Sequence, residues 1–266
     1  MTYDPSLYDA VIPASFQGDL EWYVSKARES GGPVLELGAG TGRVTLAIAK
    51  AGVTIHALDA SEPMLEALKD KLQESDPSVR ERVHVVHADM RTFELSQKFA
   101  LIIAPFRAFL HNVTETDRLA CLSNVRRHLQ PGGRLAFNVF HPSLEYMAQH
   151  AGPLAGVWRW TETRVLPTGA IVVRSEANRY DTVRQVVHSQ HRYDVHDANG
   201  LLTRTWLHRL ELAYLYHGDV CRLLSETGFT DVHISGDFTG RELSKDTDEL
   251  VVEATASHFV KGDSGR

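Results

Sequence analysis

The chain has 266 residues, of which 43% are hydrophobic and 23% are charged, as expected for a globular protein with one large domain or a core and a cap. Its net charge of −6 does not favour nucleic acid as a partner, because phosphates attract basic surfaces. The sequence contains no apolar run long enough to cross a membrane and no signal-peptide pattern, so we expect a cytoplasmic protein. Cys121 and Cys221 lie in expected helices and are interpreted as free thiols.

The N-terminal segment, residues 1–32, is expected to form a helix that packs on the rest of the chain. Apolar residues recur there at helical spacing before the pair Gly31-Gly32. They are Phe16, Leu20, Tyr23, Val24 and Ala27.

The next stretch, Val34 to Ser61, predicts a strand, a glycine-rich turn, a helix and a second strand. The first strand covers Val34 to Leu37, and glycines follow at positions 38, 40 and 42. A helical pattern then runs to Gly52, and the second strand ends at Asp59. Parallel strands joined by such a helix bind ligands at their carboxyl ends, where Asp59 is placed to accept hydrogen bonds from ribose hydroxyls.

Further strands are expected at residues 83–87, 99–104, 135–140, 229–235 and 249–256, separated by amphipathic helices. Asp89 follows the third strand of the series, the loop 105–112 follows the fourth, and His141 follows the fifth directly. These polar residues are therefore expected at the same edge of the sheet as Asp59.

Between the fifth strand and the last helix the pattern changes to period-two runs, at residues 157–165, 170–180, 184–196 and 203–216. The sequence Asp197-Ala198-Asn199-Gly200 predicts a hairpin between the last two. One face of the final strand would carry Arg204, Trp206, His208, Leu210, Leu212, Tyr214 and Tyr216. We interpret the region 151–216 as an antiparallel insert over the cleft, which could also be a packing layer or the interface of a homodimer.

Three histidines in this insert, His188, His191 and His196, suggest a metal site at first sight. On a strand His188 and His196 share one face while His191 points to the other, so they cannot converge without a bulge. We therefore predict no metal site.

The glycine spacing decides between two kinds of nucleotide site. A dinucleotide motif would have a third glycine at position 43, which is arginine, whereas the chain has G-x-G-x-G with Glu36 two residues before it. This arrangement resembles the class I S-adenosylmethionine-dependent methyltransferases, whose first motif is commonly written E/D-x-G-x-G-x-G. The resemblance covers about Val34 to Phe140, includes Leu129-Gln130-Pro131-Gly132-Gly133, and returns near the C-terminus.

The resemblance implies an α/β fold, a Rossmann-like doubly wound seven-stranded sheet with an antiparallel last strand. It implies a lid or helix at residues 1–32, a cofactor-binding core at 33–150 and 217–258, and the insert as substrate cap. Separately, we expect a disordered tail at 259–266. S-adenosylmethionine would be the cofactor. Its expected contacts are Tyr8, Glu36, Gly38, Ala39, Gly40, Arg43, Asp59, Ala60, Met64, Asp89, Met90, Arg91, Pro105 and Phe106.

Several of these residues have expected roles by the same resemblance. Tyr8 would contact the cofactor from the lid, Met64 would pack on adenine, and Asp89 would accept the adenine amine. His111 is the first choice for a catalytic base and His141 the second, with Tyr214 as a residue that orients by hydrogen bonding rather than as a base.

We therefore expect a methyltransferase that acts on N or O of a small molecule. Loop 105–112 lacks the Asn/Asp-Pro-Pro-Tyr/Phe signature of nucleic-acid amino methyltransferases and the carboxylates of metal-dependent catechol methyltransferases. The alternatives are a methyltransferase-like cofactor-binding domain with a regulatory or partner-binding role, a dehydrogenase, and a protein methyltransferase.

Overall fold

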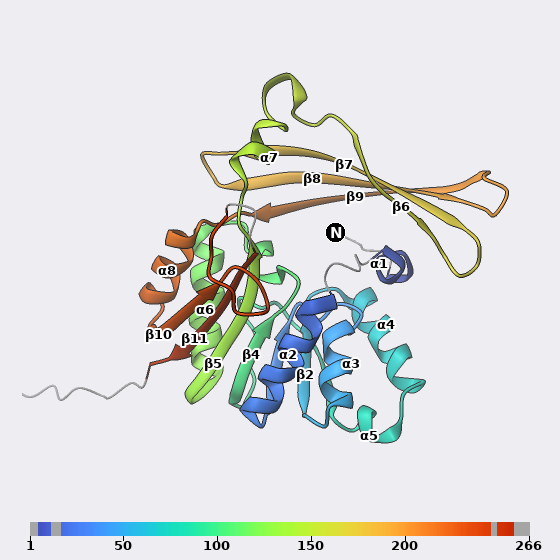
Figure 1. Ribbon diagram of the computed structural model, residues 1–266. Helices are drawn as coiled ribbons and strands as arrows, with labels where there is room; N and C mark the ends of the chain where they lie inside the picture. Colours follow the sequence, from blue (N-terminus) through green and yellow to red (C-terminus); the bar gives the residue numbers. More distant parts are fainter. Residues whose placement is uncertain (1–4, 12–16, 246–248, 258–266) are drawn as a thin grey trace, which may run out of the picture.

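A seven-stranded sheet forms the centre of the computed structural model, which describes residues 5–11, 17–245 and 249–257 (Figure 1). The strands are β1 (Val34–Leu37), β2 (Ile55–Asp59), β3 (Val83–His87), β4 (Phe99–Ala104), β5 (Leu129–Phe140), β10 (Phe229–Ser235) and β11 (Glu249–Ala256). Their order is β10-β11-β5-β4-β1-β2-β3. Strands β1 to β5 pair in parallel, whereas β11 is antiparallel to both of its neighbours. The predicted Rossmann-like sheet with an antiparallel last strand is confirmed.

Helices cover both faces of this sheet. One face carries α2 (Gln17–Ser30), α3 (Arg43–Lys50) and α4 (Glu62–Gln73), with the short α5 (Pro77–Arg80) beside them, and the other carries α6 (Glu115–His128) and α8 (His217–Glu226). Along β1, Val34 packs with the first group, and Leu35 and Leu37 pack with the second. Because both faces are buried, the core strands read as continuous apolar runs rather than alternating ones.

The strand bounds agree with the predictions for β1, β3, β4, β10 and β11. Strand β5 starts at Leu129 rather than at the predicted Leu135, because Leu129 already pairs with Phe99 before an irregularity in the register. The last strand of the insert stops at Ala213, short of the predicted Tyr216. The reason is that the Tyr216 amide donates to the Asp219 carboxylate, 3.0 Å away, at the start of α8.

A second, antiparallel sheet lies across the carboxyl ends of the core strands (Figure 1). It consists of β6 (Arg159–Val165), β7 (Ile171–Asp181), β8 (Val186–His196) and β9 (Leu202–Ala213), and we call it the cap sheet. The helices α7 (Leu144–Ala148) and η3 (Gly152–Leu154) lead to it from β5. The predicted hairpin is confirmed: the Asp197 carboxylate accepts the amides of Asn199 and Leu201, both at 2.9 Å.

The short helix α1 (Pro5–Val11) lies between the core and the cap sheet (Figure 1). Asp9 accepts the Thr41 hydroxyl at 2.5 Å and pairs with Lys71 of α4, while Arg164 of β6 donates to the carbonyl of Ala10. Residues 1–4 and 12–16 of the expected lid and the expected tail, 259–266, lie outside the described residues. Within the described part of the chain, every helix is too short or too polar to span a bilayer.

The turn between β1 and α3 needs glycine at position 42 for two reasons. Gly42 has φ +87°, a conformation that side chains disfavour, and a Cβ there would lie 2.2 Å from Cδ1 of Leu68. Leu68 is fully buried on α4, so the turn and α4 pack together without room for a methyl group.

We expect Gly42→Ala to lower the free energy of unfolding by roughly 2–5 kcal/mol, the sum of the left-handed backbone cost and overpacking. The matched control is Gly52→Ala, because Gly52 has φ +91° but open space where a Cβ would stand. The control should lose only the backbone part, about 1–2 kcal/mol. Urea unfolding of both variants measures the difference, and equal losses would contradict the packing argument.

Candidate functional site

A cavity of about 630 Å³ lies between the carboxyl ends of the core strands and the cap sheet. Its size is in the range of small-molecule sites. The core and α1 contribute Tyr8, Gly38, Gly40, Leu58, Asp59, Ala60, Ser61, Met64, Ala88, Asp89, Met90, Arg91, Pro105, Phe106, Arg107, Ala108, His111 and Asn112. Most of the predicted cofactor contacts therefore lie in one wall.

The glycine-rich turn is closed onto the end of β2. The amides of Gly38 and Ala39 donate to the carbonyl of Leu58, at 2.8 and 3.0 Å. The Asp59 carboxylate accepts the Gly40 amide with one oxygen and the Ser61 amide with the other, both at 2.8 Å. Asp59 thus shapes the turn, and each of its oxygens still has a lone pair for a ligand in the cavity.

Glu36, Ala39 and Arg43 were predicted to contact the cofactor, but they are not among the residues that line the cavity. Glu36 is buried and accepts the Thr45 hydroxyl. Arg43 forms two hydrogen bonds with the fully buried Asp19, and its guanidinium lies 5.5 Å from the ring centre of Phe106. In this structure Arg43 packs against Phe106, which lines the cavity, and does not line the cavity itself.

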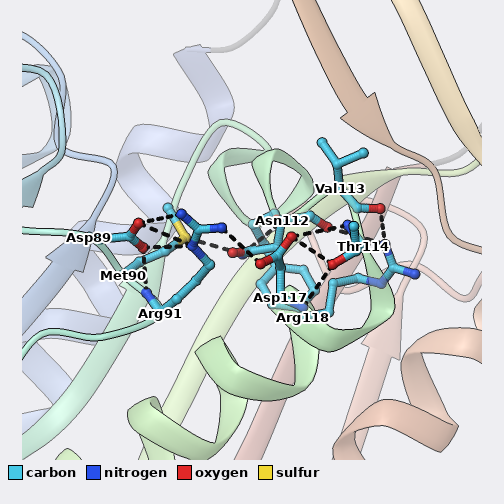
Figure 2. A network of polar contacts seen from close by, with 9 residues as sticks. Asp89, Met90, Arg91, Asn112, Val113, Thr114, Asp117 and Arg118 are labelled. Carbon is cyan, nitrogen blue, oxygen red and sulfur yellow. Dashed lines mark hydrogen bonds and ion pairs between the residues drawn. The ribbon is translucent and has the colours of Figure 1, made fainter.

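A network of ion pairs holds the loop after β3 (Figure 2). The Arg91 guanidinium donates to Asp89 at 2.9 Å and to Asp117 at 2.8 Å, and Asp117 also completes the N-terminal cap of α6 with Thr114. Arg91 therefore joins the ends of two segments that are distant in sequence. The same hydrogen bonds hold the pKa of the Asp89 carboxyl below its usual range, so it is an anion at the cavity wall.

The loop after β4 has an unusual backbone and leads into η2 (Ala108–His111). Phe106 and Arg107 are consecutive non-glycine residues with positive φ, 53° and 63°. Arg107 forms two hydrogen bonds with Glu249 of β11, at 3.0 and 2.7 Å. The Phe106 ring meets the Tyr8 ring edge-on with centres 6.3 Å apart. Contacts from β11 and α1 thus hold a turn that costs backbone strain.

His111, the first choice for a base, lies at the end of η2 and lines the cavity. The surrounding protein lowers the pKa of its imidazole, although the Asp59 charge acts in the opposite direction. His111 is therefore neutral near pH 7 and able to accept a proton.

The cap sheet forms the roof of the cavity. Its lining residues are Arg174, His191, Tyr193, Trp206, His208, Leu210 and Leu212. Of the residues predicted to share one face of the last insert strand, four line the cavity: Trp206, His208, Leu210 and Leu212. Arg174, His191 and Tyr193 were not predicted as site residues. The pairing of β8 with β9 could have identified two of them, because it sets His191 opposite His208 and Tyr193 opposite Trp206. An irregularity in the register at Val195 and His196 makes this pairing hard to predict from the sequence.

His141 and Tyr214 do not belong to the cavity wall. The His141 ring meets Tyr216 edge-on, with centres 5.8 Å apart. Tyr214 follows the end of β9, is 1% exposed, and packs against the Tyr180 ring at 5.7 Å. Tyr214 is therefore a core residue rather than a site residue.

Comparisons with known proteins agree with this geometry. Residues 34–133 match a family model described as a methyltransferase domain. The cypemycin N-terminal methyltransferase of a Streptomyces species is 29% identical over 150 residues, which are 53% of this chain and 59% of that protein. The match thus spans about three fifths of the length of the curated relatives.

Two solved structures are similar over most of the chain. The CcbJ methyltransferase from Streptomyces caelestis has a TM-score of 0.73 and 23% identity, with 91% of this chain and 96% of that one covered. The glycopeptide N-methyltransferase MtfA has a TM-score of 0.56 and 26% identity, with 88% and 92% covered. Both likenesses support the fold.

Glu36 should make the stability of the protein depend on pH. Burial raises the pKa of its carboxyl from the ordinary 4.5 to about 8. The folded state therefore binds more protons than the unfolded state between these values, and the stability that Glu36 contributes below about pH 4.5 is lost as the pH rises to 8.

Glu36→Gln removes this loss, so its stability relative to the natural protein should rise from pH 5 to pH 8. We expect a rise of at least about 1.4 kcal/mol, the free energy of one pKa unit. Urea unfolding at the two pH values measures it, with Glu66→Gln on the exposed side of α4 as the control. A constant difference between Glu36→Gln and the natural protein would contradict the burial effect.

Proposed function

We propose that this chain is a class I S-adenosylmethionine-dependent methyltransferase, with S-adenosylmethionine as its cofactor, and that it methylates a nitrogen or oxygen atom of a small molecule. The observation that carries the proposal is one cavity that joins the carboxylates Asp59 and Asp89 to His111. An amine nitrogen is the acceptor that we favour.

The wall of the cavity that the core strands form suits the cofactor in chemistry and in shape. Asp59 would accept hydrogen bonds from the ribose hydroxyls and Asp89 from the adenine amine, with Met64 as an apolar contact for the ring. The turn also has no space for a side chain at Gly38, where a Cβ would lie 2.7 Å from Cβ of Ala108. The bare backbone would let a ligand approach closely.

When bound, S-adenosylmethionine supplies a methyl carbon that its positive sulfonium activates for in-line displacement. The chain's own residues would align the acceptor and exclude water, and the roof residues Trp206, Leu210 and Leu212 provide the apolar surface for that. A base is needed only where the acceptor is protonated or weakly acidic. His111 would then take the proton, because its imidazole is neutral near pH 7.

Two observations support an amine as acceptor. A neutral imidazole in the cavity wall matches the need to remove a proton from an ammonium group before it can react. The glycopeptide N-methyltransferase MtfA, which is similar to this chain, is named for a nitrogen acceptor, and the cypemycin N-terminal methyltransferase is named for the N-terminus of its substrate. The experiment is a panel of amines, amino sugars, phenols, carboxylates and thiols assayed for release of S-adenosylhomocysteine. Release with none of them would contradict the proposal and favour a binding or regulatory role.

We expect His111→Gln to lower kcat with an amine acceptor by about 100-fold at pH 7, because the positioned base is lost. The loss should shrink at a pH above the pKa of the amine, where the acceptor is already neutral. His141→Gln is the comparison, since His141 lies outside the cavity wall. Equal activity of His111→Gln and the natural enzyme at all pH values would exclude His111 as the base.

We expect Asp59→Asn to weaken binding of S-adenosylhomocysteine by roughly 1–3 kcal/mol, because charged hydrogen bonds to the ribose are lost. Isothermal titration calorimetry measures the affinity, and the melting temperature without ligand reports on the turn that Asp59 also holds. Asp76→Asn, at an exposed position before α5, is the control. Unchanged affinity would remove Asp59 from the cofactor site.

A further inference from the structure

A chain of hydrogen bonds under the cap sheet connects His191, which lines the cavity, to the carboxylate of Glu176 on β7. Tyr146 of α7 donates to Oε1 of Glu176 at 2.6 Å. The Asn178 amide nitrogen lies 3.1 Å from the Tyr146 hydroxyl and 3.2 Å from Oε1 of Glu176. The Ser189 hydroxyl lies 2.6 Å from Oδ1 of Asn178 and 2.9 Å from Nε2 of His191.

The donor and acceptor roles along this chain follow from the carboxylate, which can only accept. Because Asn178 faces Glu176, it must present its amide N–H there, and its carbonyl oxygen therefore faces Ser189. Ser189 has a single hydroxyl hydrogen and donates it to that carbonyl. The Ser189 oxygen is then left to accept, so Nε2 of His191 must carry the proton and donate it.

With the proton on Nε2, the other ring nitrogen of His191, Nδ1, is a hydrogen-bond acceptor. The ring lines the cavity, and none of the described residues forms a hydrogen bond with Nδ1, which is not buried. Burial, together with the nearby Arg174 and His208, lowers the pKa of His191 to about 3. The ring therefore keeps its lone pair at neutral pH.

We propose that Nδ1 of His191 accepts a hydrogen bond from a hydroxyl or N–H group of the methyl acceptor, at a position away from the methylated atom. Glu176 is the positioning residue that sets the tautomer through Asn178 and Ser189. The rings of Tyr193 and Trp206 lie on the same face of the sheet, beside His191 and His208. This part of the roof would thus select a ring compound that carries a hydrogen-bond donor, and the selection rests on the proposed function.

Glu176→Gln is the variant that tests the role of Glu176 most directly. In Glu176→Gln the amide oxygen should stay near Arg174, whose Nη2 lies 3.5 Å from Oε2 in the natural protein. The amide nitrogen then faces Tyr146 and Asn178, so Asn178 turns over and every donor in the chain reverses. Ser189 donates to Nε2 of His191, and the ring proton moves to Nδ1. The volume of the side chain does not change.

The first measurement is independent of any substrate. Two-bond ¹H–¹⁵N correlation spectra of the full chain, labelled with ¹⁵N-histidine and assigned with His191→Phe, report the tautomer of each histidine. We expect the Nε2–H form for His191 in the natural protein and the Nδ1–H form in Glu176→Gln. Should Glu176→Gln not fold, Ser189→Ala breaks the same chain and should leave His191 as a mixture of tautomers. The control is Glu211→Gln, which changes the exposed partner of His188 on the outer face, 2.9 Å away.

The second measurement uses the acceptor that gives the highest release of S-adenosylhomocysteine in the panel. We expect His191→Phe and Glu176→Gln to raise KM for it about tenfold with a smaller change in kcat, as for one lost hydrogen bond. His191→Asn, whose carbonyl oxygen can replace Nδ1, should restore part of the affinity. An acceptor analogue without the donor group should bind the natural enzyme and His191→Phe equally.

An Nδ1–H tautomer in the natural protein, or an unchanged tautomer in both Glu176→Gln and Ser189→Ala, would overturn the assignment of Glu176. An unchanged KM in His191→Phe would overturn the contact with the acceptor. A panel without turnover would instead contradict the proposed function, and the spectra would still decide the tautomer.

Discussion

The hydrogen bond from the Gly40 amide to the Asp59 carboxylate is the contact on which the cavity wall formed by the core strands depends. It ties the turn after β1 to the end of the neighbouring strand, and the amides of Gly38 and Ala39 close the turn further onto Leu58. Side chains at Gly38 and Gly42 would collide with Ala108 and Leu68. These hydrogen bonds and close contacts fix the backbone of the turn at the edge of the cavity.

The charges around the cavity are mostly held in pairs. Arg91 binds Asp89 and Asp117, Arg107 binds Glu249, and Arg43 binds Asp19. By contrast, the surrounding protein lowers the pKa of the three histidines that line the cavity, His111, His191 and His208, because it disfavours the charged imidazole. Such a site offers lone pairs rather than positive charge, which suits an acceptor with N–H or O–H groups.

Residues far from the cavity hold its most strained segment. Two successive positive φ angles at Phe106 and Arg107 cost of the order of 1–3 kcal/mol each, and the ion pair with Glu249 offsets part of this. Glu249 is in turn bound by Asn138, and Asn138 by the Tyr23 hydroxyl of α2, at 2.7 and 2.8 Å. The loop that carries His111 is thus supported by β5, β11 and α2 through one connected set of side chains.

The amino-acid sequence by itself determined the strands of the core, the glycine turn and the strand-end carboxylates. These features are local: apolar runs, glycine spacing and the rule that ligands bind at the carboxyl ends of parallel strands. That rule placed Asp59, Asp89 and His111 in one cleft, but it also placed His141 there, which does not line the cavity. The residues that share one face of β9 could also be grouped from the sequence, because side chains alternate along a strand.

Only the tertiary structure decided how the insert pairs and what lies across from the core. Cross-strand register involves residues that are distant in sequence, and the irregularity at Val195 and His196 shifts it, so His191, Tyr193 and Arg174 could not be assigned to the roof. The same holds for Arg43, which Asp19 holds outside the cavity wall, and for Tyr214, which packs against Tyr180. Partner choice among charged and aromatic side chains depends on long-range packing, whereas strand formation depends on neighbours along the chain.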